Sequence, residues 1–323
     1  MLIIREEDVK DLIDFKEAVD IIERALEYQA KGEAQLIPRS RIFMREKVYH
    51  VMAASIEPLD VVGLKTYLSI PGRTSFAVII FSIRSGEILS LIEADLLGRI
   101  RTGAASAIAT KYLARKDARA LGIIGSGRQS YTQALAILSI RYFDHVFVSS
   151  LNRENSEIFV KRLREKGYNA FVADSLHDLF IKSDVISSAT NSRQPFIKAE
   201  YIRDGLHMNL VGSNHPDRAE AYPEVFLKTR LVVTDSIEQA KRESGDLIEA
   251  VRKGYIYWEK IHELWELVVG RVSRSSEDEV TLFKSHGVAL WDVALAKLIY
   301  EKARSKGVGQ EISFSGFWRD RYF

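Results

Sequence analysis

The chain has 323 residues, and its 46 Lys and Arg nearly balance its 44 Asp and Glu, which leaves a formal net charge of +2. This balance argues against a nucleic-acid partner, and the absence of cysteine excludes disulfides, thiolate metal sites and a cysteine nucleophile. The His residues show no zinc-ligand spacing, no apolar run is long enough to span a membrane, and the first residues do not resemble a signal peptide, so we expect a soluble, cytoplasmic protein with no metal site and no membrane partner.

The first part of the chain predicts two helices on either side of a meander of strands. Residues 15–31 carry apolar side chains at helical spacing and end at Gly32. A long helix, rich in Ala after Arg101, is predicted over residues 94–113. Short apolar runs between these helices predict strands at residues 41–44, 48–52, 61–68, 76–83 and 87–92.

The most informative stretch is a glycine-rich loop. An apolar run, residues 121–124, leads into Gly125-Ser-Gly127-Arg-Gln-Ser130 and then into a helical pattern over residues 131–140. In a dinucleotide-binding loop the first Gly permits a tight turn, the second lets the backbone approach the pyrophosphate, and the third position must be small. Ser130 replaces the third Gly but is still small. The strand before the loop and the helix after it therefore favour a dinucleotide site.

Strands and helices alternate after this loop. A helix is predicted over residues 155–166 and a surface loop over residues 271–279. This alternation predicts an α/β fold, a doubly wound parallel sheet of the Rossmann type. A final helix over residues 288–305 is expected to pack beside the nucleotide-binding domain. The predicted strands are residues 145–149, 169–172, 184–188, 206–211 and 230–234.

The end of the second strand of this domain bears on the choice of cofactor. NAD-selective domains place an acidic residue there to bind the ribose hydroxyls, whereas this chain has Ser149-Ser-Leu-Asn152-Arg153. A guanidinium pairs well with a ribose phosphate, and Arg128 adds charge beside the pyrophosphate. We therefore expect NADP(H) to be preferred over NAD(H), although Arg153 could also be a solvated residue at a helix start.

Four motifs resemble those of the ornithine cyclodeaminase and mu-crystallin family, which also contains an archaeal-type alanine dehydrogenase. They are Arg-Thr-Gly-Ala-Ala-Ser at 101–106, Gly-x-Gly-x-Gln at 125–129, Val-Gly-Ser-Asn at 211–214 and Phe-Lys-Ser-His-Gly at 283–287. The resemblance covers nearly the whole chain and includes Pro38-Arg39 and the Lys of Val-Gly-Leu-Lys-Thr. It implies a homodimer, with a Rossmann domain at residues 116–299 inserted into an α+β substrate-binding and dimerisation domain at residues 1–115 and 300–323.

The resemblance also implies how a substrate is held. It places Lys65 in the substrate site, where the amine assists proton transfer, and it makes Arg39 and Arg101 a clamp for an amino-acid carboxylate. A planar guanidinium suits that task because it forms two charge-assisted hydrogen bonds. From the residues alone, Lys65 could instead be a strand lysine that reaches solvent, and both arginines could be surface residues.

The sequence departs from the family at Asn214, where the cyclodeaminase and the alanine dehydrogenase have an Asp. An amide cannot act as a carboxylate base, which weakens the case for ornithine cyclisation. His286 lies in a segment that the family places over the nicotinamide and the substrate, and it could supply the proton instead. The alternative is that His286 caps the final helix.

The expected cofactor-binding residues follow the glycine loop and the strand ends. They are Arg101, Thr102, Gly125, Ser126, Gly127, Arg128, Gln129, Asn152, Arg153, Ser188, Ala189, Thr190, Val211, Gly212, Ser213 and Ser285.

These features together predict an NAD(P)(H)-dependent enzyme that acts on a small amino acid, keto acid or cyclic imine. Hydride transfer would pass through an imine, as in an amino-acid dehydrogenase or imine reductase. One alternative is an ornithine cyclodeaminase, an ammonia-lyase that uses NAD catalytically. The other is a mu-crystallin-like protein that binds NADPH and a small carboxylate ligand with little turnover.

Overall fold

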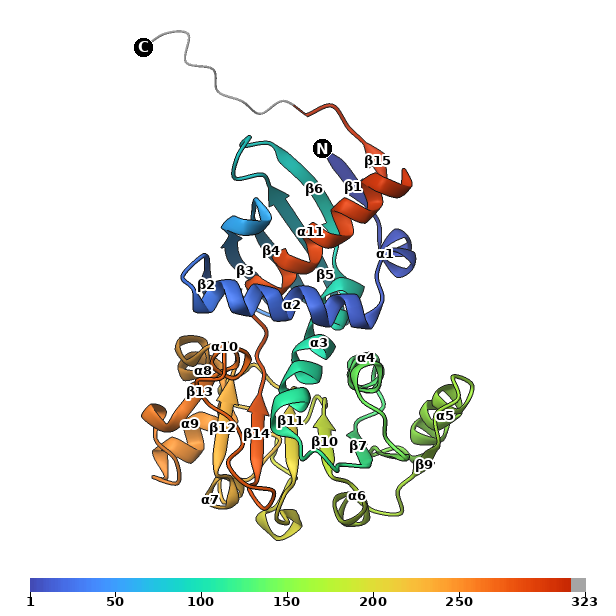
Figure 1. Cartoon of the computed structure of the whole chain (residues 1–323), viewed down its shortest axis with the longest axis vertical. Helices are drawn as coiled ribbons and strands as arrows, with labels where there is room; N and C mark the ends of the chain where they lie inside the picture. Colours follow the sequence, from blue (N-terminus) through green and yellow to red (C-terminus); the bar gives the residue numbers. More distant parts are fainter. Residues whose placement is uncertain (315–323) are drawn as a thin grey trace. The chain divides into compact units, whose positions relative to one another are not determined.

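The structure is a computed structural model that describes residues 1–314 and divides into two compact units (Figure 1). Unit 1 comprises Met1–Arg101 and Val288–Phe323, and unit 2 comprises Thr102–Gly287. The units therefore divide within the long helix and just before the final helix, not at the expected boundaries near residues 115 and 300. Residues 315–323 of the expected first domain lie outside the described residues.

Unit 1 is built on a mostly antiparallel sheet of seven strands, in the order β15-β1-β6-β5-β4-β3-β2. The five predicted strands are confirmed as β2 to β6. The strands β1 and β15 were not predicted, because three residues and two residues are too short to show an alternating pattern. The bounds are Leu2–Ile4 (β1), Ala34–Met44 (β2), Lys47–Ile56 (β3), Val61–Ile70 (β4), Arg73–Phe81 (β5), Ile88–Glu93 (β6) and Gln310–Glu311 (β15).

Two long helices of unit 1, α2 (Phe15–Ala30) and α11 (Ala289–Lys306), pack against each other and against β2 and β3 (Figure 1). The helix α11 also packs on β4 and β5 and belongs to unit 1, whereas residues 288–299 were expected in the nucleotide-binding domain. Residues 289–296 are all buried, as in a helix that is covered on every side, so the apolar pattern alone does not show which sheet covers it. The remaining helices are α1 (Glu6–Leu12), η1 (Glu57–Leu59) and the start of α3 (Asp95–Leu113).

Unit 2 contains a parallel sheet of eight strands, in the order β13-β12-β14-β11-β10-β7-β8-β9. The chain order reverses between β7 and β10, which is the switch point of a doubly wound sheet and the usual place for a ligand. This confirms the predicted fold class. The bounds are Ala120–Ile124 (β7), His145–Ser149 (β8), Ala170–Val172 (β9), Val185–Ser188 (β10), His207–Leu210 (β11), Leu231–Thr234 (β12), Ile261–Glu263 (β13) and Thr281–Lys284 (β14).

The rest of α3 belongs to unit 2 and packs closely on α4 (Arg128–Ile140). A Cβ atom on Gly103 would lie 2.7 Å from the Thr132 carbonyl oxygen, which explains the run of small residues after Arg101. No helix within residues 1–314 is long and apolar enough to cross a membrane. The other helices are α5 (Arg153–Arg164), α6 (Leu176–Lys182), α7 (Val225–Lys228), α8 (Ile237–Glu243), α9 (Gly245–Arg252), α10 (Leu264–Val268), η2 (Ala199–Tyr201) and η3 (Trp258–Lys260).

Candidate functional site

The glycine-rich loop joins β7 to α4 and is tied to the two neighbouring strands. Gly125 has a φ of 101°, and a Cβ atom there would lie 2.8 Å from the Ala189 carbonyl oxygen. Its N–H donates to the Ser149 carbonyl oxygen at 2.8 Å. The Ser130 hydroxyl donates to the Ala189 carbonyl oxygen at 3.0 Å. The loop therefore needs a glycine at 125 and a small residue at 130, as predicted.

The space beside Gly127 is open. This residue is the N-cap of α4, and no atom lies within 4 Å of the position that its Cβ would take. Arg128 is exposed, whereas Ser126 and Gln129 are half-buried. Helix N-terminal amides and the positive end of the helix dipole face an anion at such a position. The residues present therefore fit the pyrophosphate of a dinucleotide.

At the end of β8 the predicted ribose-side residues have local partners. The Asn152 side chain caps α5 by accepting a hydrogen bond from the Asn155 N–H at 3.2 Å. The Arg153 Nε atom lies 3.3 Å from an oxygen of Glu157, and both side chains are more than half exposed. An exposed pair four residues apart contributes little to stability, so this pairing leaves Arg153 able to exchange Glu157 for another anion.

A buried carboxylate that the sequence did not reveal, Glu220, joins the ends of β10 and β11. It accepts hydrogen bonds from the Ser188 hydroxyl at 2.7 Å, the Thr190 hydroxyl at 2.8 Å and the Gly212 N–H at 2.8 Å. The predicted residues Ser188 and Thr190 thus direct their hydroxyls at Glu220. A cofactor at this edge of the sheet would therefore meet the backbone of Ala189 and Thr190 and not these hydroxyls. Glu220 lies in an irregular segment with no motif, so no sequence signal marked it.

His286 and Ser285 follow β14 and are held by Asp235, which follows the neighbouring strand β12. Asp235 accepts hydrogen bonds from the His286 N–H at 2.6 Å and the Ser285 hydroxyl at 3.2 Å, and its Oδ1 lies 3.2 Å from His286 Nδ1. Burial alone would raise the pKa of Asp235, but the hydrogen bonds and charge of His286 and the Gly287 N–H lower it to about 2. Asp235 is therefore an anion that favours a proton on Nδ1 of His286.

The structure does not support the helix-capping alternative for His286, because the N-cap of α11 is Val288 and no side chain caps it. Asn214 follows β11 in a loop where Val211, Gly212 and Asn214 are half-buried and Ser213 is buried. The strands β11 and β14 are paired, with Leu210 opposite Lys284. The segments that carry Asn214 and His286 therefore leave the same edge of the sheet from adjacent strands.

Unit 1 brings the three predicted cations together in its core. Arg39, Lys65 and Arg101 are 5%, 3% and 7% exposed, so none of them is a surface residue. Lys65 Nζ lies 2.8 Å from Oδ1 of Asp292, and Arg101 Nε lies 3.0 Å from the same oxygen. Asp292 lies on α11 and is fully buried. Sequence reasoning missed this carboxylate because it stands in a helix whose pattern otherwise indicates only packing.

Local structure explains how these side chains come to be buried. Arg39 follows Pro38 at an irregularity in the pairing of β2 with β3, and such a bulge re-aims a side chain. Lys65 shares a strand face with Val61 and Gly63, which are buried, and its Nζ lies 5.5 Å from the centre of the Phe76 ring. On α3, a Cβ atom at Gly98 would lie 2.8 Å from Lys65 Nζ, so the helix backbone closes over the ammonium group.

The neighbours of Lys65 act on its pKa in opposite directions. Burial lowers the pKa of Lys65, and the Asp292 carboxylate opposes this shift. Arg101 and Arg39 lower that pKa further, to about 8. The buried Nη1 of Arg101 and the buried Oδ2 of Asp292 have no hydrogen-bond partner among residues 1–314. Since buried polar atoms are normally paired, Arg101 retains a donor for an anionic ligand such as a carboxylate.

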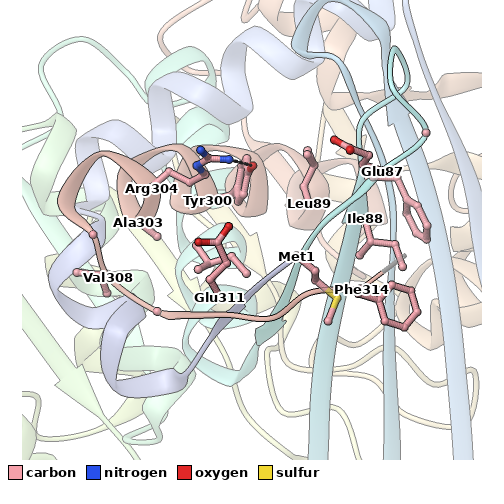
Figure 2. A pocket seen from close by; sticks show the side chains of 15 residues that line it. Met1, Glu87, Ile88, Leu89, Tyr300, Ala303, Arg304, Val308, Glu311 and Phe314 are labelled. Carbon is pink, nitrogen blue, oxygen red and sulfur yellow. Dashed lines mark hydrogen bonds between the residues drawn. The ribbon is translucent and has the colours of Figure 1, made fainter. Parts of the chain in front are cut away.

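A cavity of about 690 Å³ lies in another part of unit 1, beside β6, β15 and the end of α11 (Figure 2). Arg304 donates to the Tyr300 hydroxyl at 3.3 Å there, and Glu87, Glu311 and Phe314 also line the cavity. None of the predicted site residues belongs to its described lining. Its charges are of mixed sign and mostly solvated, so size alone does not make it the functional site.

Known proteins match this chain over nearly its whole length. A model of the Ornithine cyclodeaminase/mu-crystallin family matches residues 1–307. The chain belongs to this family. Alanine dehydrogenase from Archaeoglobus fulgidus is 35% identical over 322 residues, which cover 97% of this chain and 98% of that protein.

Two solved structures of family members share the fold. The Thermococcus litoralis Delta(1)-pyrroline-2-carboxylate reductase, in complex with NADH and L-proline, has a TM-score of 0.92 and 34% identity over 97% of this chain and 100% of that one. An archaeal alanine dehydrogenase dimer with bound NAD has a TM-score of 0.92 and 34% identity, and covers 98% of this chain and 99% of that one. Both of these members of the ornithine cyclodeaminase/mu-crystallin family are enzymes with a nicotinamide cofactor bound.

Proposed function

We propose that this protein is an NAD(P)(H)-dependent oxidoreductase that reduces a small imino acid, or the imine formed from a keto acid, and catalyses the reverse oxidation of the amino acid. The observation on which the proposal chiefly depends is that the buried Lys65 and Arg101 share one oxygen of Asp292, with Arg39 buried nearby. Lys65 and Arg101 thus share a single counter-ion, and Nη1 of Arg101 has no partner within residues 1–314, which suits a substrate that brings a second carboxylate. The relatives named above act on, or bind, such small amino and imino acids.

Within unit 1, Arg39 and Arg101 would bind the substrate carboxylate, and Nη1 of Arg101 has the donor capacity for it. Lys65 would hold the proton that the reaction needs at Nζ. Its pKa of about 8 leaves it mostly protonated at pH 7 and still able to release the proton. A catalytic acid works best when its pKa is close to the working pH.

Within unit 2, the open space at Gly127 and the N-terminus of α4 would hold the cofactor pyrophosphate. A bound reduced nicotinamide supplies the hydride that adds to the imine carbon. Reduction of a neutral imine to an ammonium product takes up one hydride and two protons: Lys65 would supply the proton that makes the imine nitrogen electrophilic, and His286, with its ring oriented by Asp235, would supply the second. The family resemblance implies a carboxylate for this transfer at the position of Asn214. Asn214 can donate a hydrogen bond, but it cannot exchange a proton as a carboxylate does.

The test is a panel of amino acids, keto acids with ammonia, and cyclic imines, assayed for two products at once. We expect consumption of NADPH or NADH with imines and formation of the reduced cofactor with amino acids. Ammonia release from ornithine without net change in the cofactor would identify a cyclodeaminase instead. Tight binding of NADPH and a carboxylate without either reaction would identify a binding protein.

We further propose that NADPH binds more tightly than NADH. Ser149, Ser150 and Asn152 leave the end of β8 without a carboxylate to repel a ribose phosphate, and Arg153 can exchange Glu157 for it. Arg153→Ala should then weaken NADPH binding by roughly 1–3 kcal/mol, the range for a hydrogen bond to a charged group, and leave NADH binding unchanged. Calorimetric titration measures both. Lys166→Ala is the matched control, and equal or tighter NADH binding by the unmodified protein contradicts the preference.

We also propose that the protein is a homodimer that pairs through the sheet of unit 1. The edge strand β2 exposes Ile42 by 59%, and the register through Tyr49 places it on the same face as Leu68 and Val62 of β4, opposite Lys65. Exposed apolar patches of this kind mark interfaces. Light scattering should give twice the chain mass, and Ile42→Asp should give a monomer. Ile181→Asp, at an equally exposed isoleucine of unit 2, should leave the dimer intact. A monomeric unmodified protein contradicts the proposal.

A further inference from the structure

The geometry points to Asp292 as a positioning residue that holds Lys65 and Arg101 at one carboxylate oxygen and keeps Lys65 charged for proton transfer. The role of Lys65 in proton transfer rests on the proposed function. Its physical core, the control of one ammonium by one carboxylate, can be measured on the protein without any substrate.

Lys65 and Arg101 share one oxygen of Asp292. Lys65 Nζ and Arg101 Nε lie 2.8 Å and 3.0 Å from the same atom, Asp292 Oδ1. Two cations from different elements, β4 and α3, are therefore fixed by one side chain from α11. Charge-assisted bonds of this length restrict both partners. Any movement of Asp292 would shift the proton-carrying amine and the proposed carboxylate-binding guanidinium together.

The groups around Nζ of Lys65 act on its charge in opposite directions. Arg39 from β2 and Arg101 from α3 each oppose a positive charge on Lys65, and so does burial. The Phe76 ring of β5 lies 5.5 Å away, and His50 of β3 stacks on Tyr67, two residues along β4. Of the groups named here, Asp292 is the one whose charge raises the pKa of Lys65. Without its charge, a buried lysine beside two arginines would lose its proton at neutral pH.

Asp292 leaves its second carboxylate oxygen unused. Its Oδ2 is buried and has no hydrogen-bond partner within residues 1–314. A carboxylate that served only to anchor α11 would be expected to use both oxygens, because an unpaired buried acceptor is costly. Asp292 instead places one oxygen against two functional cations. This arrangement indicates that Asp292 controls the charge of Lys65 and does not only anchor α11.

The decisive experiment is a titration of Lys65 by NMR in protein labelled at lysine Cε, with the signal assigned through Lys65→Met. In the unmodified protein we expect an apparent pKa near 8. Asp292→Asn keeps the shape but removes the charge, and it should lower this pKa by roughly 1–3 units, the usual effect of one nearby charge. Asp60→Asn, which removes another carboxylate of unit 1 that bonds to Ser82, is the matched control and should leave Lys65 unchanged.

Asp292→Glu provides a second variant should the Asn substitution prevent folding. It keeps the charge but moves the carboxylate, so the Lys65 pKa should stay within about one unit of the unmodified value, while the KM for the carboxylate substrate rises. The limb of the kcat/KM profile that reports Lys65 should move to lower pH in Asp292→Asn. A uniform loss of activity with no change in the limb or in the NMR titration overturns the inference. A shifted titration in a protein that reduces no imine overturns only the proposed function.

Discussion

Lys65→Met should lower kcat/KM for imine reduction by about 10²–10⁴-fold, the usual contribution of a positioned proton donor. The substitution keeps an apolar stem against Phe76 but removes the ammonium. Asp292 retains Arg101 as a partner at 3.0 Å, so its charge does not become isolated and we expect the variant to fold. Steady-state kinetics and a thermal unfolding scan measure the two effects separately.

The unmodified enzyme should show the matching pH dependence. Because Lys65 has a pKa of about 8 in the folded protein, it carries its proton below that pH and loses it above. Reduction needs the protonated form, so kcat/KM should fall as the pH rises through about 8, and oxidation of the amino acid should change in the opposite direction. Lys297→Met, on α11 and paired with Glu301, is the control. Normal kinetics of the Lys65→Met enzyme would show that this lysine has only a structural role.

His286→Ala should remove most of the reductase activity, with a loss of about 10²–10⁴-fold in kcat if this imidazole donates the second proton. Asp235→Asn should lower kcat less, because the ring remains but loses the anion that fixes its Nδ1 proton. Substrate binding through Arg39 and Arg101 should be little affected in either variant. A change confined to KM would therefore contradict the role of His286.

Asn214→Asp tests the same proton from the neighbouring strand end. In the His286→Ala background the new carboxylic acid should restore part of the activity and move the pH optimum toward lower values, since a carboxyl group titrates at lower pH than an imidazole. If His286→Ala has no effect, or if the unmodified protein converts ornithine to proline with release of ammonia and no net cofactor consumption, Asn214 does not prevent cyclodeamination.

The sequence predicted the elements that have a clear period or a glycine signature. The glycine loop, the strand before it and the helix α4 were all expected, and so was the meander β2 to β6, because alternating or continuous apolar runs mark strands of five or more residues. The strand β14 was missed although it lies between β11 and β12. Thr281 and Lys284 stand at its two ends and leave only Leu282 and Phe283 as an apolar run.

The cations of the site could be predicted, but their partners could not. Lys65 and Arg101 belong to motifs, whereas Asp292 and Glu220 act across 227 and 32 residues of chain, on Lys65 and Ser188 respectively. No local pattern encodes such a contact. The misplacement of α11 has the same origin, because an apolar helix shows that it is buried but not which sheet buries it.

The position of α11 in the chain has a consequence for biosynthesis. Unit 2 occupies one continuous stretch, Thr102–Gly287, while unit 1 needs both flanking segments. The ribosome therefore completes all strands of the nucleotide-binding sheet before it produces the helix that covers β2 to β5. Until residue 292 emerges, Lys65 and Arg101 lack their shared counter-ion. The insertion thus sets an order of maturation, in which the unit expected to bind the cofactor can fold during translation and the unit expected to bind the substrate closes last.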